Sequence, residues 1–182
     1  MDKPIVEYGR LEKRYARPIA EALAQNQEFR TWLLERTVFS GVATSARLLD
    51  QEMLAMRSKV AKSWWASHFT EACRCGGCRG QETDILAVFE TPEKSRFVLH
   101  IEVKHPGDKF KKGGTQAASY PLRATCWSTE GSTPAKVLPH SAASTVLLYS
   151  SAKSIEYRPH LEHFASLITF EEIFARFPTL SV

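Results

Sequence analysis

The stretch at residues 83–120 reads TDILAVFETPEKSRFVLHIEVKHPGDKFKKGGTQAASY. Two apolar runs rich in β-forming residues, 85–89 and 97–103, flank the turn-forming sequence Thr-Pro-Glu-Lys-Ser. We therefore expect a β-hairpin folded about Glu93, and the rest of the chain is interpreted outward from it.

The expected hairpin gathers three charged side chains. Reflection of Asp84 through the hairpin centre places it opposite Glu102. Because side chains alternate along a strand, Glu102 and Lys104 point to one face, which Asp84 reaches from the facing strand. A surface salt bridge is the commoner explanation for such residues, but here both strand charges interrupt the apolar run Val-Leu-His-Ile-Glu-Val-Lys. This placement favours a functional site.

The chemistry of this trio suits a hard divalent cation. Two neighbouring carboxylates repel each other unless a cation lies between them. Oxygen ligands completed by water suit Mg²⁺ or Mn²⁺ better than zinc. A lysine beside a metal-bound water would orient it, ease its deprotonation or stabilise charge developing on a phosphate. The pattern predicts metal-assisted hydrolysis of a phosphodiester.

Asp84, followed after a hairpin by Glu102-Val103-Lys104, resembles the D…(D/E)xK signature of the restriction-endonuclease-like, or PD-(D/E)XK, nuclease superfamily. Thr83 stands where that family commonly has proline. The resemblance is strong over roughly the middle third of the chain. It implies an α/β fold with a central mixed β-sheet of about four or five strands flanked by helices.

Two further features extend the resemblance. The sequence Gln116-Ala-Ala-Ser-Tyr120 resembles the QxxxY element of the exonuclease-like branch, and its spacing of four places both residues on one helical face. Members of the superfamily often carry another acidic residue on an early helix. Glu12 is the first candidate and Glu21 the second, with a solvated helix face as the alternative for each.

The resemblance implies a role for each site residue. Asp84 and Glu102, helped by the backbone carbonyl of Val103, would hold Mg²⁺ or Mn²⁺, and Lys104 would position or activate the attacking water. Gln116 would steady the lysine, water or phosphate, and Tyr120 would support that face. The expected activity is hydrolysis of DNA, and the absence of a helicase partner favours an endonuclease.

Length and composition indicate one soluble globular domain spanning residues 1–182, with a helical part at 1–67 and a sheet core at 68–182. The net charge of +4 suits a polyanionic partner without identifying one. Basic residues lie near the expected site, although a solvated lysine loop is the alternative: Lys104, Lys109, Lys111, Lys112 and Arg123.

The N-terminal sequence lacks the basic-then-apolar pattern of a signal peptide, and no apolar run is long enough to cross a bilayer. The chain has four cysteines. Without a secretion signal they point to a reducing compartment, so disulfides are not expected. We expect a cytoplasmic protein that does not enter the membrane.

Three cysteines fall within six positions, at Cys73, Cys75 and Cys78. They would form a zinc site with His68 or Cys126 as the fourth ligand, or an iron–sulfur site, which some relatives carry at a different spacing. The alternative is a hairpin in which the cysteines are small strand residues. Zinc knuckles normally show two separated pairs, so we predict no metal here.

The N-terminal part is expected to be helical. Residues 1–40 show helical spacing, with a break or restart at Pro18. The longest helix is expected at 45–66, capped by Ser45. Its apolar stripe is expected to be core: Leu49, Met53, Met56, Val60 and Trp64.

The C-terminal part is expected to alternate helix and strand. A helix beginning near Thr115 would be short or kinked because of Pro121, and Leu122, Ala124 and Trp127 would pack it onto the sheet. Strands are expected at 145–149 and 164–168, and surface loops at 128–139 and 151–163, where His160 and His163 would face solvent. Thr169 and Glu172 form a capping box that opens a helix ended by Pro178.

Two other classes of function remain open. One is a nucleic-acid-binding domain with the same fold that does not cleave; the other is a zinc-organised interaction domain built on the cysteine cluster. The sequence does not distinguish DNA from RNA as the partner, contains no specificity element, and does not reveal the pathway. Many relatives are dimers, so a homodimer is compatible with the resemblance.

Overall fold

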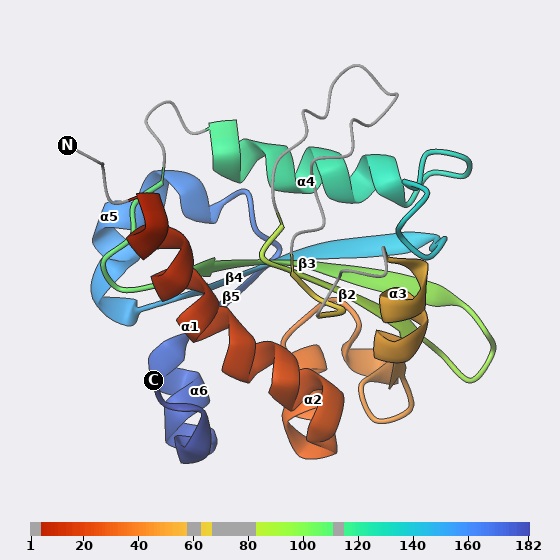
Figure 1. Cartoon of the computed structure of the whole chain (residues 1–182), viewed down its shortest axis with the longest axis horizontal. Helices are drawn as coiled ribbons and strands as arrows, with labels where there is room; N and C mark the ends of the chain where they lie inside the picture. The colour runs from red at the N-terminus through yellow and green to blue at the C-terminus, as the bar shows by residue number, and fades with distance from the viewer. Residues whose placement is uncertain (1–4, 58–62, 67–82, 111–114) are drawn as a thin grey trace.

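The computed structural model describes residues 5–57, 63–66, 83–110 and 115–182 (Figure 1). Six α-helices and five β-strands are assigned within these ranges. In chain order they are α1 (Ile5–Gln25), α2 (Gln27–Leu34), β1 (Arg47–Leu48), α3 (Asp50–Met56), β2 (Ile85–Glu90), β3 (Arg96–Lys104), α4 (Thr115–Trp127), β4 (Ala142–Tyr149), α5 (Ser154–Leu161), β5 (Ser166–Thr169) and α6 (Phe170–Arg176).

The strands form one mixed sheet in the order β1-β2-β3-β4-β5. The first three strands pair antiparallel, whereas β3, β4 and β5 pair parallel through the crossover helices α4 and α5. Figure 1 shows α4 covering one face of the sheet and α1, α2 and α6 on the other. The expected α/β fold with a five-stranded mixed sheet flanked by helices is confirmed.

The hairpin has the register expected from its sequence. Ile85 on β2 pairs with Ile101 on β3, and Glu90 pairs with Arg96 across the turn. The turn requires a left-handed backbone at Lys94, whose φ is 68°. Asp84 directly precedes β2, so it reaches the end of the ladder where Glu102 lies.

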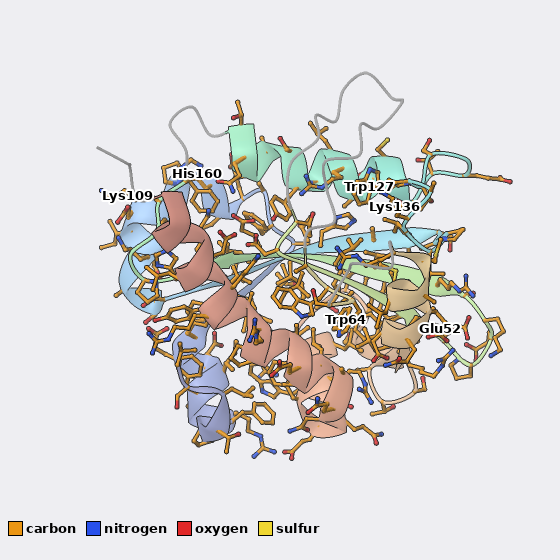
Figure 2. The ribbon with its side chains drawn as sticks, viewed as in Figure 1. Glu52, Trp64, Lys109, Trp127, Lys136 and His160 are labelled. Atoms are coloured by element: carbon orange, nitrogen blue, oxygen red, sulfur yellow. The ribbon has the colours of Figure 1, made fainter. Side chains whose placement is uncertain are left out.

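Burial of both faces of β2 and β3 explains why the sequences of these strands are continuous apolar runs. Every residue of β2 is buried, and so is every residue of β3 after Arg96, because helices cover both faces of these central strands. Trp127 points from α4 toward the sheet, where its ring lies 5.4 Å from that of His100 (Figure 2). A smaller apolar cluster joins α4, β4 and α5 through Tyr120, Tyr149 and Tyr157.

The helix expected at residues 45–66 is wrong. The segment contributes the edge strand β1, and its helix α3 ends at Met56. Ser45 does not cap it; its hydroxyl donates to the carbonyl of Val42 instead. Backbone pairing with β2 overrides the helical spacing, since the N–H of Leu49 donates to the carbonyl of Val88 at 2.9 Å. The expected helical part at 1–67 therefore also supplies a strand.

The apolar stripe predicted for this segment is nevertheless core where it is described. Leu49, Met53 and Trp64 are buried, and Met56 is half-buried. Val60 lies outside the described residues. Residue type therefore predicted burial correctly, although within the described part of 45–66 only Asp50–Met56 is helical.

Two internal prolines do not end their helices, so the break or restart expected at Pro18 is wrong. Helix α1 runs 21 residues through Pro18 and ends just before Asn26, whose side chain caps α2 by accepting from the N–H of Phe29 at 3.0 Å. Helix α4 runs 13 residues through Pro121. Each proline removes one backbone hydrogen bond, and packing of the buried residues on either side of it keeps the helix intact.

Some of the remaining expectations for the C-terminal part are wrong and others are confirmed. The segment 151–163 is not a loop, because α5 spans Ser154–Leu161. Leu122 is 58% exposed and does not pack on the sheet, unlike Ala124 and Trp127. The last strand begins two residues later than expected. The loop after α4, the strand β4 and the capping box of α6 are confirmed.

Candidate functional site

Asp84, Glu102 and Lys104 meet at the open end of the hairpin. Lys104 Nζ lies 2.8 Å from Glu102 Oε1, so the two alternate residues of β3 share a face as expected. Asp84 Oδ2 accepts a hydrogen bond from the backbone N–H of Val103 at 2.6 Å. The three side chains predicted from the hairpin pattern therefore come together around Val103.

Helix α4 brings Gln116 and Tyr120 to the same carboxylate. Gln116 Nε2 donates to Glu102 Oε1 at 3.0 Å, and Gln116 Oε1 accepts from Lys104 Nζ at 3.3 Å. The hydroxyl of Tyr120 donates to Glu102 Oε2. The spacing of four places both side chains on the same face of α4, as the sequence predicts, and this face lies against the sheet. Their immediate role is to hold Glu102 and Lys104 in position.

Asp108 also belongs to the site and was missed from the sequence. Its Oδ2 lies 3.1 Å from Lys104 Nζ, and its backbone carbonyl accepts from the hydroxyl of Tyr157 at 2.7 Å. The ring of Phe110 lies 5.0 Å from the same ammonium. The signal was present in the spacing, because the Pro-Gly-Asp turn places Asp108 four residues after Lys104.

Of the two acidic residues proposed on the first helix, Glu12 is the one beside the site. Its side chain hydrogen-bonds to Asp84. Glu21 is exposed. Helix α1 packs against β3, and this contact brings a residue 72 positions earlier in the chain to Asp84. The sequence alone offered no way to choose between the two glutamates.

The site concentrates negative charge where water cannot screen it. Burial raises the pKa of Asp84 well above its usual range, and the charge of Glu102 and the hydrogen bond between the Asp84 carboxyl and Glu12 raise it further. Burial also raises the pKa of Tyr120, with the charge of Glu102 acting in the same direction. Among the described residues, the ammonium of Lys104 pairs with Glu102 and Asp108 and not with Asp84, so the neighbouring carboxylates of Asp84 and Glu102 are a donor pair that fits an added cation.

Lys104 is held in its charged form. Burial acts to lower the pKa of its ammonium, but the charges and hydrogen bonds of Glu102 and Asp108 outweigh burial and raise that pKa. A lysine in this state donates hydrogen bonds and stabilises negative charge; it does not remove protons. Of the roles considered from the sequence, positioning water and stabilising charge therefore fit better than acting as a base.

The side chains of the site are closed off from solvent. Glu102 is 0% exposed, Lys104 4% and Asp84 8%. Within the described ranges, no three or more His, Cys, Asp or Glu side chains converge as a ready-made metal centre. A cation bound here would instead be coordinated by the carboxylates of Asp84 and Glu102, by water and by the backbone carbonyl of Val103, the ligand predicted from the sequence. It would compete with the hydrogen-bond donors that now hold Glu102.

The basic residues expected around the site are only partly on the surface. Lys109 is exposed, whereas Arg123 is 1% exposed and its guanidinium lies 4.7 Å from the centre of the Tyr120 ring. Arg123 is therefore not a surface contact for phosphate. Lys111 and Lys112 fall outside the described residues, as do Cys73, Cys75, Cys78 and His68 of the cysteine cluster. Cys126 is half-buried.

The two histidines expected to face solvent are only partly exposed. His160 and His163 are half-buried, and the ring of His160 lies 4.5 Å from that of Phe110. Figure 2 shows His160 and Lys109 at the same end of the molecule. Burial lowers the pKa of His160, and the charges of His163 and Lys104 act in the same direction. The end of β3 is thus bordered by aromatic rings as well as by charged groups.

Comparison of the chain with family models, curated proteins and solved structures found no match. Among the helices of the described segments, none has the length and apolar character that a bilayer span requires. Function must therefore be argued from the geometry of the site.

Proposed function

We propose that the protein is a divalent-metal-dependent nuclease that hydrolyses DNA phosphodiester bonds, as an endonuclease with a site of the PD-(D/E)XK kind. The observation that carries this proposal is the meeting of Asp84, Glu102 and Lys104 at one hairpin end, with Gln116 and Tyr120 bonded to the same carboxylate. A structural ion pair would require only the lysine and one acid. The surplus carboxylates are what the proposal explains.

Each residue has a role that its contacts support. Asp84 and Glu102, with the Val103 carbonyl, would hold Mg²⁺ or Mn²⁺, which when bound supplies Lewis-acid polarisation of a phosphate and an acidified water. Lys104, fixed between Glu102 and Asp108, directs its ammonium at charge that develops on the phosphate. Gln116 links the lysine to the carboxylate, so that neither side chain can turn away independently.

Protons must leave before a cation can bind at this site. Carboxylate ligands coordinate in their ionised form, and the pKa of Asp84 is raised by burial, by Glu102 and by Glu12. Cation binding would favour the ionised form and release a proton. We therefore expect cleavage to fall as the pH falls, with a midpoint above the ordinary range of an aspartate.

One observation favours a second candidate, a nucleic-acid-binding domain that does not cleave. The three central side chains are almost completely buried, and both oxygens of Glu102 already accept hydrogen bonds from the protein. A vestigial site would have this closed arrangement. Such a protein would hold DNA equally well with or without a divalent cation, whereas the nuclease cleaves only with one.

The test is a cleavage assay on supercoiled plasmid, linear duplex, single-stranded DNA and RNA, each with Mg²⁺, Mn²⁺ or a chelator. We expect nicking of the plasmid that needs the cation. Asp84→Asn should reduce the rate at least 100-fold, because the amide still accepts from the Val103 N–H but loses its charge. Asp50→Asn, at the start of α3, is the matched control and should cleave normally.

Two results would decide against the nuclease. Full activity of Asp84→Asn would show that cleavage does not depend on Asp84, the residue on which the proposed metal site is built. Binding without cleavage under every condition would favour the second candidate. Lys104→Ala is a less clean test, because it leaves buried Glu102 without its cation and is expected to cost about 3–5 kcal/mol of stability. Its loss of activity should be interpreted only alongside a folding measurement.

A further inference from the structure

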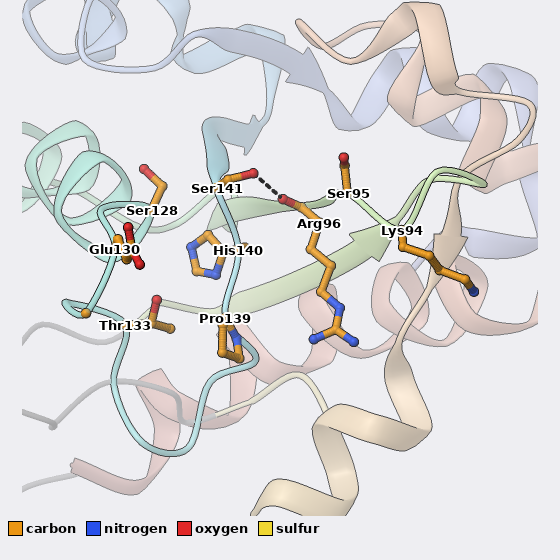
Figure 3. A pocket seen from close by; sticks show the side chains of 10 residues that line it. Lys94, Ser95, Arg96, Ser128, Glu130, Thr133, Pro139, His140 and Ser141 are labelled. Carbon is orange, nitrogen blue, oxygen red and sulfur yellow. Dashed lines mark hydrogen bonds between the residues drawn. The ribbon is translucent and has the colours of Figure 1, made fainter.

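A cleft lies at the opposite end of β3 from the candidate active site (Figure 3). Its volume is about 460 Å³, and its walls come from the hairpin turn and from the loop between α4 and β4. Arg96 begins β3 and Lys104 ends it, so about 26 Å of strand separates the two sites at the usual rise per residue. The cleft is therefore independent of the site proposed for DNA hydrolysis.

His140 supplies a buried acceptor in the wall of this cleft. Its Nδ1 lies 2.9 Å from the carbonyl oxygen of Leu138, and because a carbonyl only accepts, Nδ1 carries the hydrogen. Nε2 then presents a lone pair. The residue is 7% exposed, and Nε2 has no hydrogen-bond partner in the part of the chain that the structure describes. Burial lowers the pKa of the imidazole, which keeps this lone pair available at neutral pH.

An unpaired buried acceptor is unfavourable, because burial removes its hydrogen bonds to water and no protein donor replaces them. The other polar groups near it do not relieve the cost, because they are committed elsewhere: the hydroxyl of Ser128 donates to the carbonyl of Thr125, and that of Thr133 to the carbonyl of Trp127. A donor that enters the cleft would complete the bonding of His140.

Arg96 supplies hydrogen-bond donors and a positive charge, in contrast to the acceptor of His140. Its Nε donates to Glu90 Oε2 at 3.1 Å, while its two terminal nitrogens have no partner among the described residues. The side chain is 34% exposed and lines the cleft. A guanidinium with a free pair of donors is suited to bidentate binding of a phosphate. Glu130, which also lines the cleft and forms no ion pair in the described structure, adds a second acceptor.

We propose that this cleft binds a small phosphorylated molecule with hydroxyl or amino donors, of the class and size of a nucleoside monophosphate. The phosphate would lie against the terminal nitrogens of Arg96, and a donor of the sugar or base would reach Nε2 of His140. The volume falls within the range of small-molecule sites. A bare phosphate would satisfy Arg96 alone, and an uncharged nucleoside would satisfy only the acceptors.

Calorimetric titration of the full chain with adenosine monophosphate, adenosine, ribose 5-phosphate and inorganic phosphate tests the proposal. We expect saturable binding of the monophosphate, with adenosine and inorganic phosphate each at least tenfold weaker. His140→Asn retains a donor for the Leu138 carbonyl but lacks the second nitrogen, and Arg96→Gln removes the guanidinium. Each should weaken binding at least tenfold, whereas Arg158→Gln, an exposed arginine on α5, should not.

A measurement on the unmodified protein guards against variants that fold poorly. The ¹⁵N resonance of His140 Nε2 should move on addition of adenosine monophosphate, as its lone pair accepts a hydrogen bond. No saturable binding below about 1 mM, or a ¹⁵N resonance that does not move when the ligand binds, would overturn the proposal. A shift caused by duplex DNA and not by the monophosphate would also overturn it, since the cleft would then contact a polymer.

Discussion

Substitution of Tyr120 by phenylalanine isolates the contact on which the geometry of the site most depends. The hydroxyl of Tyr120 is the sole donor to Glu102 Oε2 among the described residues, while Lys104 and Gln116 both bond to Oε1. Both Tyr120 and Glu102 are 0% exposed, so water cannot replace the lost donor. The change leaves a buried carboxylate oxygen without a partner.

The expected cost follows from the charge of the acceptor. A hydrogen bond to a charged group contributes about 1.5–3 kcal/mol, against about 0.5–1.5 kcal/mol for a neutral pair. For a domain of this size, each 1 kcal/mol lowers the melting temperature by about 2–4 °C. Tyr120→Phe should therefore melt about 3–12 °C below the unmodified protein. The control is Tyr157→Phe, whose ring is also buried but whose hydroxyl donates to a neutral carbonyl in a partly buried position, and it should lose about 1–6 °C.

The assay is thermal unfolding followed by circular dichroism, with urea denaturation at 25 °C to obtain the free energies of unfolding. The comparison between the two tyrosines carries the argument, because both changes remove one hydroxyl from a buried aromatic ring. If Tyr120→Phe costs no more than Tyr157→Phe, Glu102 Oε2 is not desolvated in solution. The closed, charge-dense site described here would then be refuted.

Three further predictions concern other parts of the structure. The pKa of Asp84 is raised in the folded state, so its contribution to stability is complete below about pH 4 and is lost as the pH rises through the folded pKa. Asp84→Asn should therefore flatten the decline of the free energy of unfolding measured by urea titrations between pH 4 and 9. An unchanged decline in the variant would contradict the raised pKa of Asp84. Thr169→Ala removes the hydroxyl that caps α6 by accepting from the N–H of Glu172, and it should lower the free energy of unfolding by about 1 kcal/mol, so a loss near zero would mean that this cap does not form in solution. Glu12→Gln should lower cation-dependent cleavage at least tenfold while Glu21→Gln leaves it unchanged, and equal rates for the two variants would separate Glu12 from the site.

Local patterns in the sequence were sufficient for the hairpin. Apolar runs on either side of a turn defined both strands and their register, and the register placed Asp84, Glu102 and Lys104 together. A spacing of four on a helix likewise oriented Gln116 and Tyr120. These inferences succeeded because the period of a strand or helix determines which side chains share a face.

Inferences that depended on distant contacts could not be made in the same way. The segment at 45–66 has helical spacing, yet pairing with β2 converts part of it to an edge strand. Arg123 follows the lysine-rich link in sequence, but it is buried against the ring of Tyr120. In the first case local helix propensity contributes less free energy than the strand pairing that replaces it, and in the second the burial of Arg123 depends on how α4 packs.

The sequence by itself determined the mixed α/β character of the chain, the hairpin and the identity of the charged residues at its end. Tertiary structure alone decided which glutamate of α1 approaches Asp84, how deeply Lys104 is buried, and that His140 and Arg96 line one cleft. The physical reason is that periodicity orients neighbours along one element. The contacts between elements depend on how their surfaces pack, and no single segment contains that information.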